Sequence, residues 1–128
     1  MIEQPGKKKM LVFSGSSNEE LASKVASNLG TELSTVESKE FASGEIYIRL
    51  NESVRGADCF VLQSHSGDVN KTIMEQLVLV DALKRASAKR ITAVLPFYPY
   101  SRQDKKALPR EPITARLIAD MFIAAGVD

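Results

Sequence analysis

The segment with the greatest capacity for chemistry follows a short apolar run and joins aromatic rings to opposite charges. It contains Tyr98, Tyr100 and the consecutive residues Arg102, Gln103, Asp104, Lys105 and Lys106. An arginine can hold two phosphate oxygens at once, and each charge-assisted hydrogen bond contributes about 1.5–3 kcal/mol. A solvated charged loop is the competing interpretation. Because ligands of α/β proteins gather beyond the carboxyl ends of strands, both interpretations stay open.

A second candidate combines an aromatic ring with small and acidic residues, namely Phe41, Ser43, Gly44 and Glu45. The ring could stack on a base, and the carboxylate could accept a hydrogen bond from an amino group or a ribose hydroxyl. Composition alone favours a simpler interpretation, in which the segment is a tight turn and Phe41 packs in the core.

Three weaker candidates have simple structural explanations. Residues 14–17 lack the lysine of a phosphate-binding P-loop, so Ser17 is expected only to cap a helix, with Glu20 completing a capping box. His65 is the only histidine, and without a partner a loop histidine is more often neither base nor ligand. Residues 52–56 and 85–87 each pair a hydroxyl with an arginine, and each is expected to be a turn or a helix end.

Strands and helices alternate along the chain. Hydrophobic periodicity predicts strands over 10–13, 32–36, 45–50, 59–62 and 90–95, and helices over 18–29, 70–85 and 113–124. Met74, Leu77 and Leu83 are expected in the core of the second helix. This order predicts an α/β fold with a mostly parallel sheet flanked by helices, and a long loop over 97–112.

Bulk composition predicts one ordinary globular domain. The chain has 128 residues, 44% of them apolar, and 17 basic against 16 acidic residues give a net charge of +1. No nucleic acid or membrane partner is therefore expected. The single cysteine, Cys59, cannot form an internal disulfide and fits a cytoplasmic location. Residues 1–9 are expected to form a flexible tail and residues 10–128 the domain.

Five ordered segments together resemble the amino-terminal domain of ribose-phosphate pyrophosphokinase, also called phosphoribosyl pyrophosphate synthetase. They are residues 41–45, 52–56, 81–88, 99–106 and 110–113, and the resemblance runs from about Met10 onward. It implies a phosphoribosyltransferase-like domain, one of two α/β domains in each subunit of a homo-oligomer. In the family, this oligomer is a hexamer built from dimers.

The resemblance also implies an activity and residue roles. The family transfers the diphosphoryl group of Mg-ATP to ribose 5-phosphate, making phosphoribosyl pyrophosphate for nucleotide biosynthesis. Arg102 and Gln103 would contact ATP, with Asp104, Lys105 and Lys106 close by. Phe41, Ser43, Gly44 and Glu45 would reach the nucleoside of ATP bound mainly to a neighbouring subunit. Ser53, Arg55 and Ser87 match an allosteric phosphate or ADP site.

The family pattern differs from this chain in several places. Ser43 stands where the family usually has Asp or Asn, and Leu108 and Pro109 stand where it often has a polar or basic residue. The metal-binding histidine and the catalytic loops of the family correspond to positions after Asp128, so no metal ligand or catalytic residue is expected here. The chain alone is expected to be inactive, to bind ATP weakly and to self-associate. A non-catalytic, synthetase-like regulatory subunit and a generic nucleotide-binding α/β domain remain the alternatives.

Overall fold

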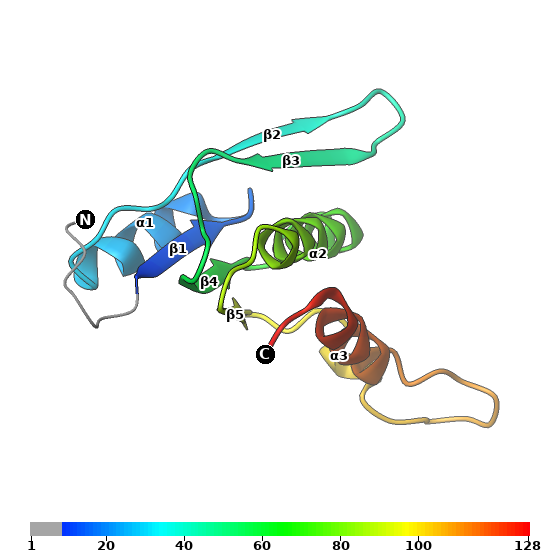
Figure 1. Cartoon of the computed structure of the whole chain (residues 1–128). Helices are drawn as coiled ribbons and strands as arrows, with labels where there is room; N and C mark the ends of the chain where they lie inside the picture. Colours follow the sequence, from blue (N-terminus) through cyan, green and yellow to red (C-terminus); the bar gives the residue numbers. More distant parts are fainter. Residues whose placement is uncertain (1–8) are drawn as a thin grey trace.

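Three parallel strands form the central sheet of the protein, whose computed structural model describes residues 9–128 (Figure 1). The strands are β1 (Met10–Ser14), β4 (Asp58–Leu62) and β5 (Arg90–Val94), in the order β1-β4-β5. Both neighbouring pairs are parallel, as expected for strands whose connections contain a helix. The predicted α/β class and the predicted order of elements are confirmed.

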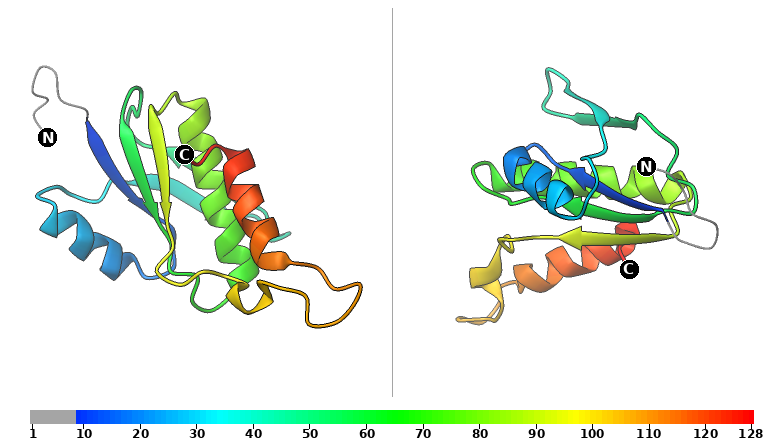
Figure 2. Two further views of the ribbon diagram at one scale, coloured as in Figure 1. Left: turned by 90° about the horizontal axis from the view of Figure 1, so that it is seen from below. Right: turned by 90° about the vertical axis from the view of Figure 1, so that its left-hand side faces the viewer.

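Helices cover both faces of this sheet (Figure 2). Side chains alternate along each strand, so Val12 and Leu62 face α1 (Glu19–Asn28), where they meet Ala22 and Ala26. The opposite face holds the main core. There α2 (Val69–Arg85) packs its buried leucines and valine against Phe13, Cys59 and Val61.

A separate antiparallel hairpin lies over α2 (Figure 1). It consists of β2 (Val36–Glu40) and β3 (Ile46–Leu50), and Val36, Ile48 and Leu50 pack toward the main core. The prediction of a strand over 32–36 is wrong, because that segment is irregular and its Ser34 N–H donates to Val12 O. The strand starts at Val36, which is the first residue of this segment whose side chain packs on the main core beside α2.

The last helix, α3 (Thr114–Ala125), packs against α2 through Ile118 and Phe122, which contact Ile73 and Leu77. Between β5 and α3, the predicted loop is interrupted by one turn of 3₁₀-helix, η1 (Ser101–Gln103). After α3, the Asp128 N–H donates to Ile91 O, and Asp128 Oδ2 accepts from Ile91 N–H, so the chain returns beside β5.

Two further predictions need correction. Asn18, not Ser17, caps α1: it has a left-handed backbone, and its side chain accepts from Leu21 N–H. Met74 is 49% exposed rather than in the core, because the face of α2 that is buried runs through Leu79, Val80 and Leu83. Among the described residues, no helix is long and apolar enough to cross a membrane. Most of the predicted tail, residues 1–8, lies outside the described part of the chain.

Candidate functional site

One open pocket of about 430 Å³ contains the two residues that the sequence singled out most strongly. One wall is Gly67, Asp68, Val69 and Asn70 at the start of α2, and the other is Phe97, Tyr100, Arg102 and Gln103. We call this the Arg102 pocket. It lies beyond the carboxyl ends of β4 and β5, where α/β proteins place their ligands.

Local hydrogen bonds hold the Arg102 wall in place. The backbone of Tyr100 is left-handed at φ 63°, and its hydroxyl donates to Asn70 Oδ1 across the pocket. Thr114 Oγ1 donates to Gln103 Oε1 at 2.6 Å, which leaves the NH₂ group of this amide free to donate elsewhere. The Arg102 side chain is exposed and forms no ion pair with residues 9–128. Both residues therefore present donors to the pocket, which suits an anionic ligand.

The three charged residues that follow do not line this pocket. Asp104, Lys105 and Lys106 are exposed in the loop between η1 and α3. The far end of this loop is held by Glu111, whose carboxylate accepts from the N–H groups of Ala107 and Leu108. Hydrogen bonds therefore fix the end of the loop, while the side chains of Lys105 and Lys106 are exposed to solvent.

The second candidate forms the tip of the β2–β3 hairpin. Phe41 is 48% exposed, so the interpretation that placed it in the core is wrong. Its ring meets Tyr47 edge to face with centroids 6.4 Å apart, and the Lys39 ammonium lies within 5.5 Å of both ring centroids. Ser43 Oγ donates to Glu45 Oε1 at 2.7 Å, and Gly44 takes the left-handed backbone that the turn requires.

The hairpin tip and the Arg102 pocket are not part of one cavity. None of Phe41, Ser43, Gly44 or Glu45 lines the pocket. The hairpin is tied to α2 through the ion pair between Glu40 and Lys71, at 2.6 Å. Lys71 follows Asn70 directly, so both candidates flank the first turn of α2 without sharing a ligand site within this chain.

The expected effector-site residues, Ser53, Arg55 and Ser87, lie at the other end of α2. The N–H of Gly56 donates to Ser87 O at 3.0 Å, which joins the loop of Ser53 and Arg55 to the residue that follows the helix. Ser53 lines a shallow pocket of about 480 Å³ together with Arg85. A 17-residue helix separates this region from the Arg102 pocket, about 25 Å along its axis.

A buried polar network under the Arg102 pocket was not predicted from the sequence. Its members are Gln63, His65, Thr72, Glu75 and Gln76, each at most 6% exposed. Gln63 accepts from Ser17 N–H and donates to Glu75, which also accepts from Ser16 N–H. The N–H groups after β1 are thus occupied by the protein itself. The sequence does contain a sign that part of this network is buried. Three of its members lie on the same face of α2 as the core residues Leu79, Val80 and Leu83, at spacings of three or four residues; they are Thr72, Glu75 and Gln76.

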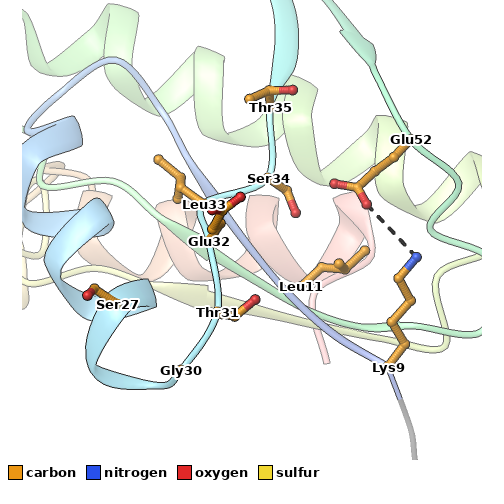
Figure 3. A pocket seen from close by; sticks show the side chains of 10 residues that line it. All are labelled: Lys9, Leu11, Ser27, Gly30, Thr31, Glu32, Leu33, Ser34, Thr35 and Glu52. Atoms are coloured by element: carbon orange, nitrogen blue, oxygen red, sulfur yellow. Dashed lines mark ion pairs between the residues drawn. The ribbon is translucent and has the colours of Figure 1, made fainter. Parts of the chain in front are cut away.

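A further polar pocket of about 690 Å³ lies between the end of α1 and the outer edge of β1 (Figure 3). Its only basic side chain, Lys9, reaches toward Glu52 across the pocket at 3.9 Å. A cation that is already paired with a carboxylate offers little to a phosphate, so this pocket is a poor match for a nucleotide. Within the described residues, no group of three or more His, Cys, Asp or Glu side chains could hold a metal ion.

Comparison with known proteins gives one consistent result. Residues 10–126 match the family model described as the N-terminal domain of ribose phosphate pyrophosphokinase. The ribose-phosphate pyrophosphokinase of Corynebacterium glutamicum is 60% identical over 121 residues, which are 94% of this chain and 37% of that protein. The one from Streptomyces avermitilis is 57% identical over 127 residues, covering 99% and 39%.

A solved structure agrees. The crystal structure of phosphoribosylpyrophosphate synthetase from Mycobacterium smegmatis superposes with a TM-score of 0.93 at 55% identity, covering 94% of this chain and 41% of that one. The chain therefore spans about two-fifths of the length of the relatives that it matches.

Proposed function

Because the chain belongs to the family of amino-terminal domains of ribose-phosphate pyrophosphokinase, we propose that it supplies the ATP-binding part of that enzyme. The reaction transfers the diphosphoryl group of Mg-ATP to the 1-hydroxyl of ribose 5-phosphate, so that AMP leaves. The product, phosphoribosyl pyrophosphate, enters nucleotide biosynthesis. The single observation that carries the proposal is the Arg102 pocket, where the side chains of Arg102 and Gln103 offer hydrogen-bond donors beyond the carboxyl ends of the strands. The relatives of this chain are ribose-phosphate pyrophosphokinases.

Phosphoryl transfer depends on positioning and charge neutralisation more than on covalent catalysis. Arg102 would grip phosphate oxygens of ATP, and the free amide NH₂ of Gln103 would orient them. Phe97 and Tyr100 offer aromatic surface beside these donors. Asp104, Lys105 and Lys106 follow Gln103 directly and are exposed, so their side chains would contact ATP from outside the pocket. Magnesium would arrive with ATP as part of the substrate, and no step is assigned to metal ligands of this chain.

We assign the hairpin tip and the far end of α2 to contacts between subunits. The half-exposed ring of Phe41 would stack on the base of ATP bound to a neighbouring copy, with Ser43, Gly44 and Glu45 contacting its ribose or amino group. Separation from the Arg102 pocket supports this division. Ser53, Arg55 and Ser87 would hold phosphate or ADP as an allosteric effector, about 25 Å from the catalytic ligand.

A homo-oligomer in the cytoplasm is the setting that fits these roles. Leu117 and Ile123 on α3 are 53% and 66% exposed, which leaves apolar surface for association. Cys59 is buried as a free thiol, in keeping with a reducing compartment. Since the Arg102 pocket is open, this chain by itself should bind ATP only weakly and should not catalyse the reaction.

A chimaera tests the proposal directly. Residues 1–128 replace the matching segment of the Mycobacterium smegmatis synthetase, which shares 55% identity and the same fold. We expect the chimaera to release AMP from ATP only when ribose 5-phosphate is present. A folded chimaera of the correct size that releases no AMP would overturn the proposal in favour of a non-catalytic, regulatory chain.

A further inference from the structure

His65 is a buried residue at a strained position beside the Arg102 pocket. It is 1% exposed and has a left-handed backbone, at φ 56°. Its Nε2 lies 2.7 Å from Gln76 Oε1, and its Nδ1 lies 3.0 Å from Thr72 Oγ1. Non-glycine residues hold such a backbone only where the surroundings fix them. Here the ring is held by Thr72 and Gln76, both on α2, and these two contacts fix the backbone of His65.

The surrounding hydrogen bonds determine where the proton of the neutral ring sits. The amide of Gln76 donates through Nε2 to Val61 O, so its Oε1 must accept from the ring. His65 therefore carries its proton on Nε2, and Nδ1 accepts from the Thr72 hydroxyl. Val69 O lies 3.0 Å from the same hydroxyl, whose single proton can go to only one of the two acceptors. The hydroxyl donates to Nδ1 while the ring is neutral and to Val69 O once Nδ1 itself carries a proton. Protonation would thus reverse the contact that joins the ring to the first turn of α2.

These contacts also fix one wall of the Arg102 pocket. His65 lies two residues before Gly67, the first residue of that wall, and Thr72 lies two residues after Asn70, the last. Thr72 N–H donates to Asp68 O, and Ser66 N–H donates to Ser17 Oγ. Residues 64–68 are therefore hydrogen-bonded to Ser17 on one side and to α2 on the other, and the buried imidazole of His65 adds two further contacts to α2.

We propose that His65 is a positioning residue of the Arg102 pocket, and that its neutral ring sets the distance between the α2 wall and Arg102. The ligand of this pocket is taken to be ATP, which rests on the proposed function. His65 does not touch the pocket itself; it acts through Gly67, Asp68 and Asn70.

The expected pH dependence has a definite sign. Burial lowers the pKa of His65 from its ordinary 6.5, against the smaller raising effects of the Gln76 hydrogen bond and the Glu75 charge. Other charges near this wall are Asp68, which caps α2, Lys71, which is paired with Glu40, and Arg102 across the pocket. A lowered pKa means that the folded surroundings disfavour the second proton, so its uptake as pH falls below 6.5 favours arrangements in which the ring is less enclosed. The wall is therefore ordered at neutral pH and loosens in acid.

Nuclear magnetic resonance on the intact chain tests this without any variant. The His65 ring and the amides of Gly67, Asp68 and Asn70 are followed in the absence of nucleotide as pH falls from 7.5. We expect the three wall amides to shift with the same midpoint as the ring. Wall amides that stay still while the ring titrates would overturn the inference, whatever the chain binds.

A second measurement uses ATP and His65→Gln, which keeps a donor near Nε2 and cannot titrate. ATP affinity is compared at pH 7.5 and 5.5, and the ratio between proteins cancels protonation of the ligand. We expect the wild type to weaken at pH 5.5 by at least about threefold more than His65→Gln. Equal pH dependence in the two proteins would contradict the inference. If ATP shifts no Arg102 resonance at pH 7.5, the proposed function fails instead, and the wall titration decides the role of His65 alone.

Discussion

Replacing Gly15 by alanine should damage the protein through one collision. A Cβ atom at this position would lie 2.2–2.5 Å from side-chain atoms of Gln63, far inside contact distance. Gln63 is 1% exposed and cannot swing into solvent. Gly15 has no positive φ, so the collision is the whole effect and backbone strain adds nothing.

The size of the effect follows from the hydrogen bonds that Gln63 must give up. They join it to Ser17 N at 2.9 Å, Thr72 O at 3.2 Å and Glu75 Oε1 at 2.6 Å. Each such bond contributes about 0.5–1.5 kcal/mol net, and overpacking a core costs about 1–3 kcal/mol. We therefore expect Gly15→Ala to lower the free energy of unfolding by about 2–4 kcal/mol.

Urea unfolding followed by circular dichroism measures this loss, and a double-mutant cycle assigns it. In a Gln63→Ala background the obstacle is gone, so Gly15→Ala should then cost less than about 0.5 kcal/mol. A single Gly15→Ala variant as stable as the wild type would refute the reasoning. So would an equal cost in both backgrounds, because the loss would then not arise from Gln63.

Three further outcomes follow from the same packing and charges. Leu79→Ala should cost about 2–5 kcal/mol in urea unfolding, since Leu79 is fully buried in the main core; a cost below that of an exposed Leu117→Ala control would contradict it. Cys59, whose pKa is raised to about 11 by burial and by the charges of Asp58 and Glu52, should not react with a thiol reagent at pH 8 until urea is added. Because the pKa of His65 is lowered on folding, the unfolded chain takes up a proton first, so stability should fall as pH drops below 6.5. His65→Gln should flatten that fall, and an equally steep fall in the variant would count against His65 as its source.

Much of the fold could be predicted from local patterns because its strands and helices are buried in a regular way. The apolar runs that became β1, β4 and β5 face helices on both sides, and their boundaries shift by only one residue. The hairpin was harder, since most of β2 is exposed and polar. It is a strand because Ile48 and Leu50 of β3 need a pairing partner above α2, which is a tertiary requirement.

The start of α1 shows why local rules fail at single residues. Ser17 fits the capping pattern, but its N–H and hydroxyl are already engaged by Gln63 and Ser66, which lie far away in sequence. Asn18 takes the cap instead, because asparagine tolerates the left-handed backbone found there.

Only the place of the candidate site in the fold can be compared with the sequence. The loop of Arg102 and Gln103 was expected beyond the carboxyl end of a strand and lies beyond β5, while the contact of these residues with ATP stays a prediction. The wall opposite them, Gly67 to Asn70, carries no motif. It lies there because β4 and β5 pair in parallel, which brings the segments that follow the two strands to the same edge of the sheet. The sequence shows His65 as a lone histidine in a loop, with no partner nearby along the chain. Its partners, Thr72 and Gln76, are polar residues on the buried face of α2, and only the packing of that face against the loop brings them to the ring.

The most direct test of the central claim is the rate of AMP release by the chimaera with Arg102→Ala, compared with Arg116→Ala. Arg116 is a matched control, an exposed arginine on α3 whose weak ion pair with Asp120 lies outside the Arg102 pocket. We predict that Arg102→Ala lowers turnover at least about tenfold, or 1.4 kcal/mol in the barrier, while Arg116→Ala leaves it unchanged. Near-wild-type turnover of Arg102→Ala would contradict the assignment of this pocket to ATP.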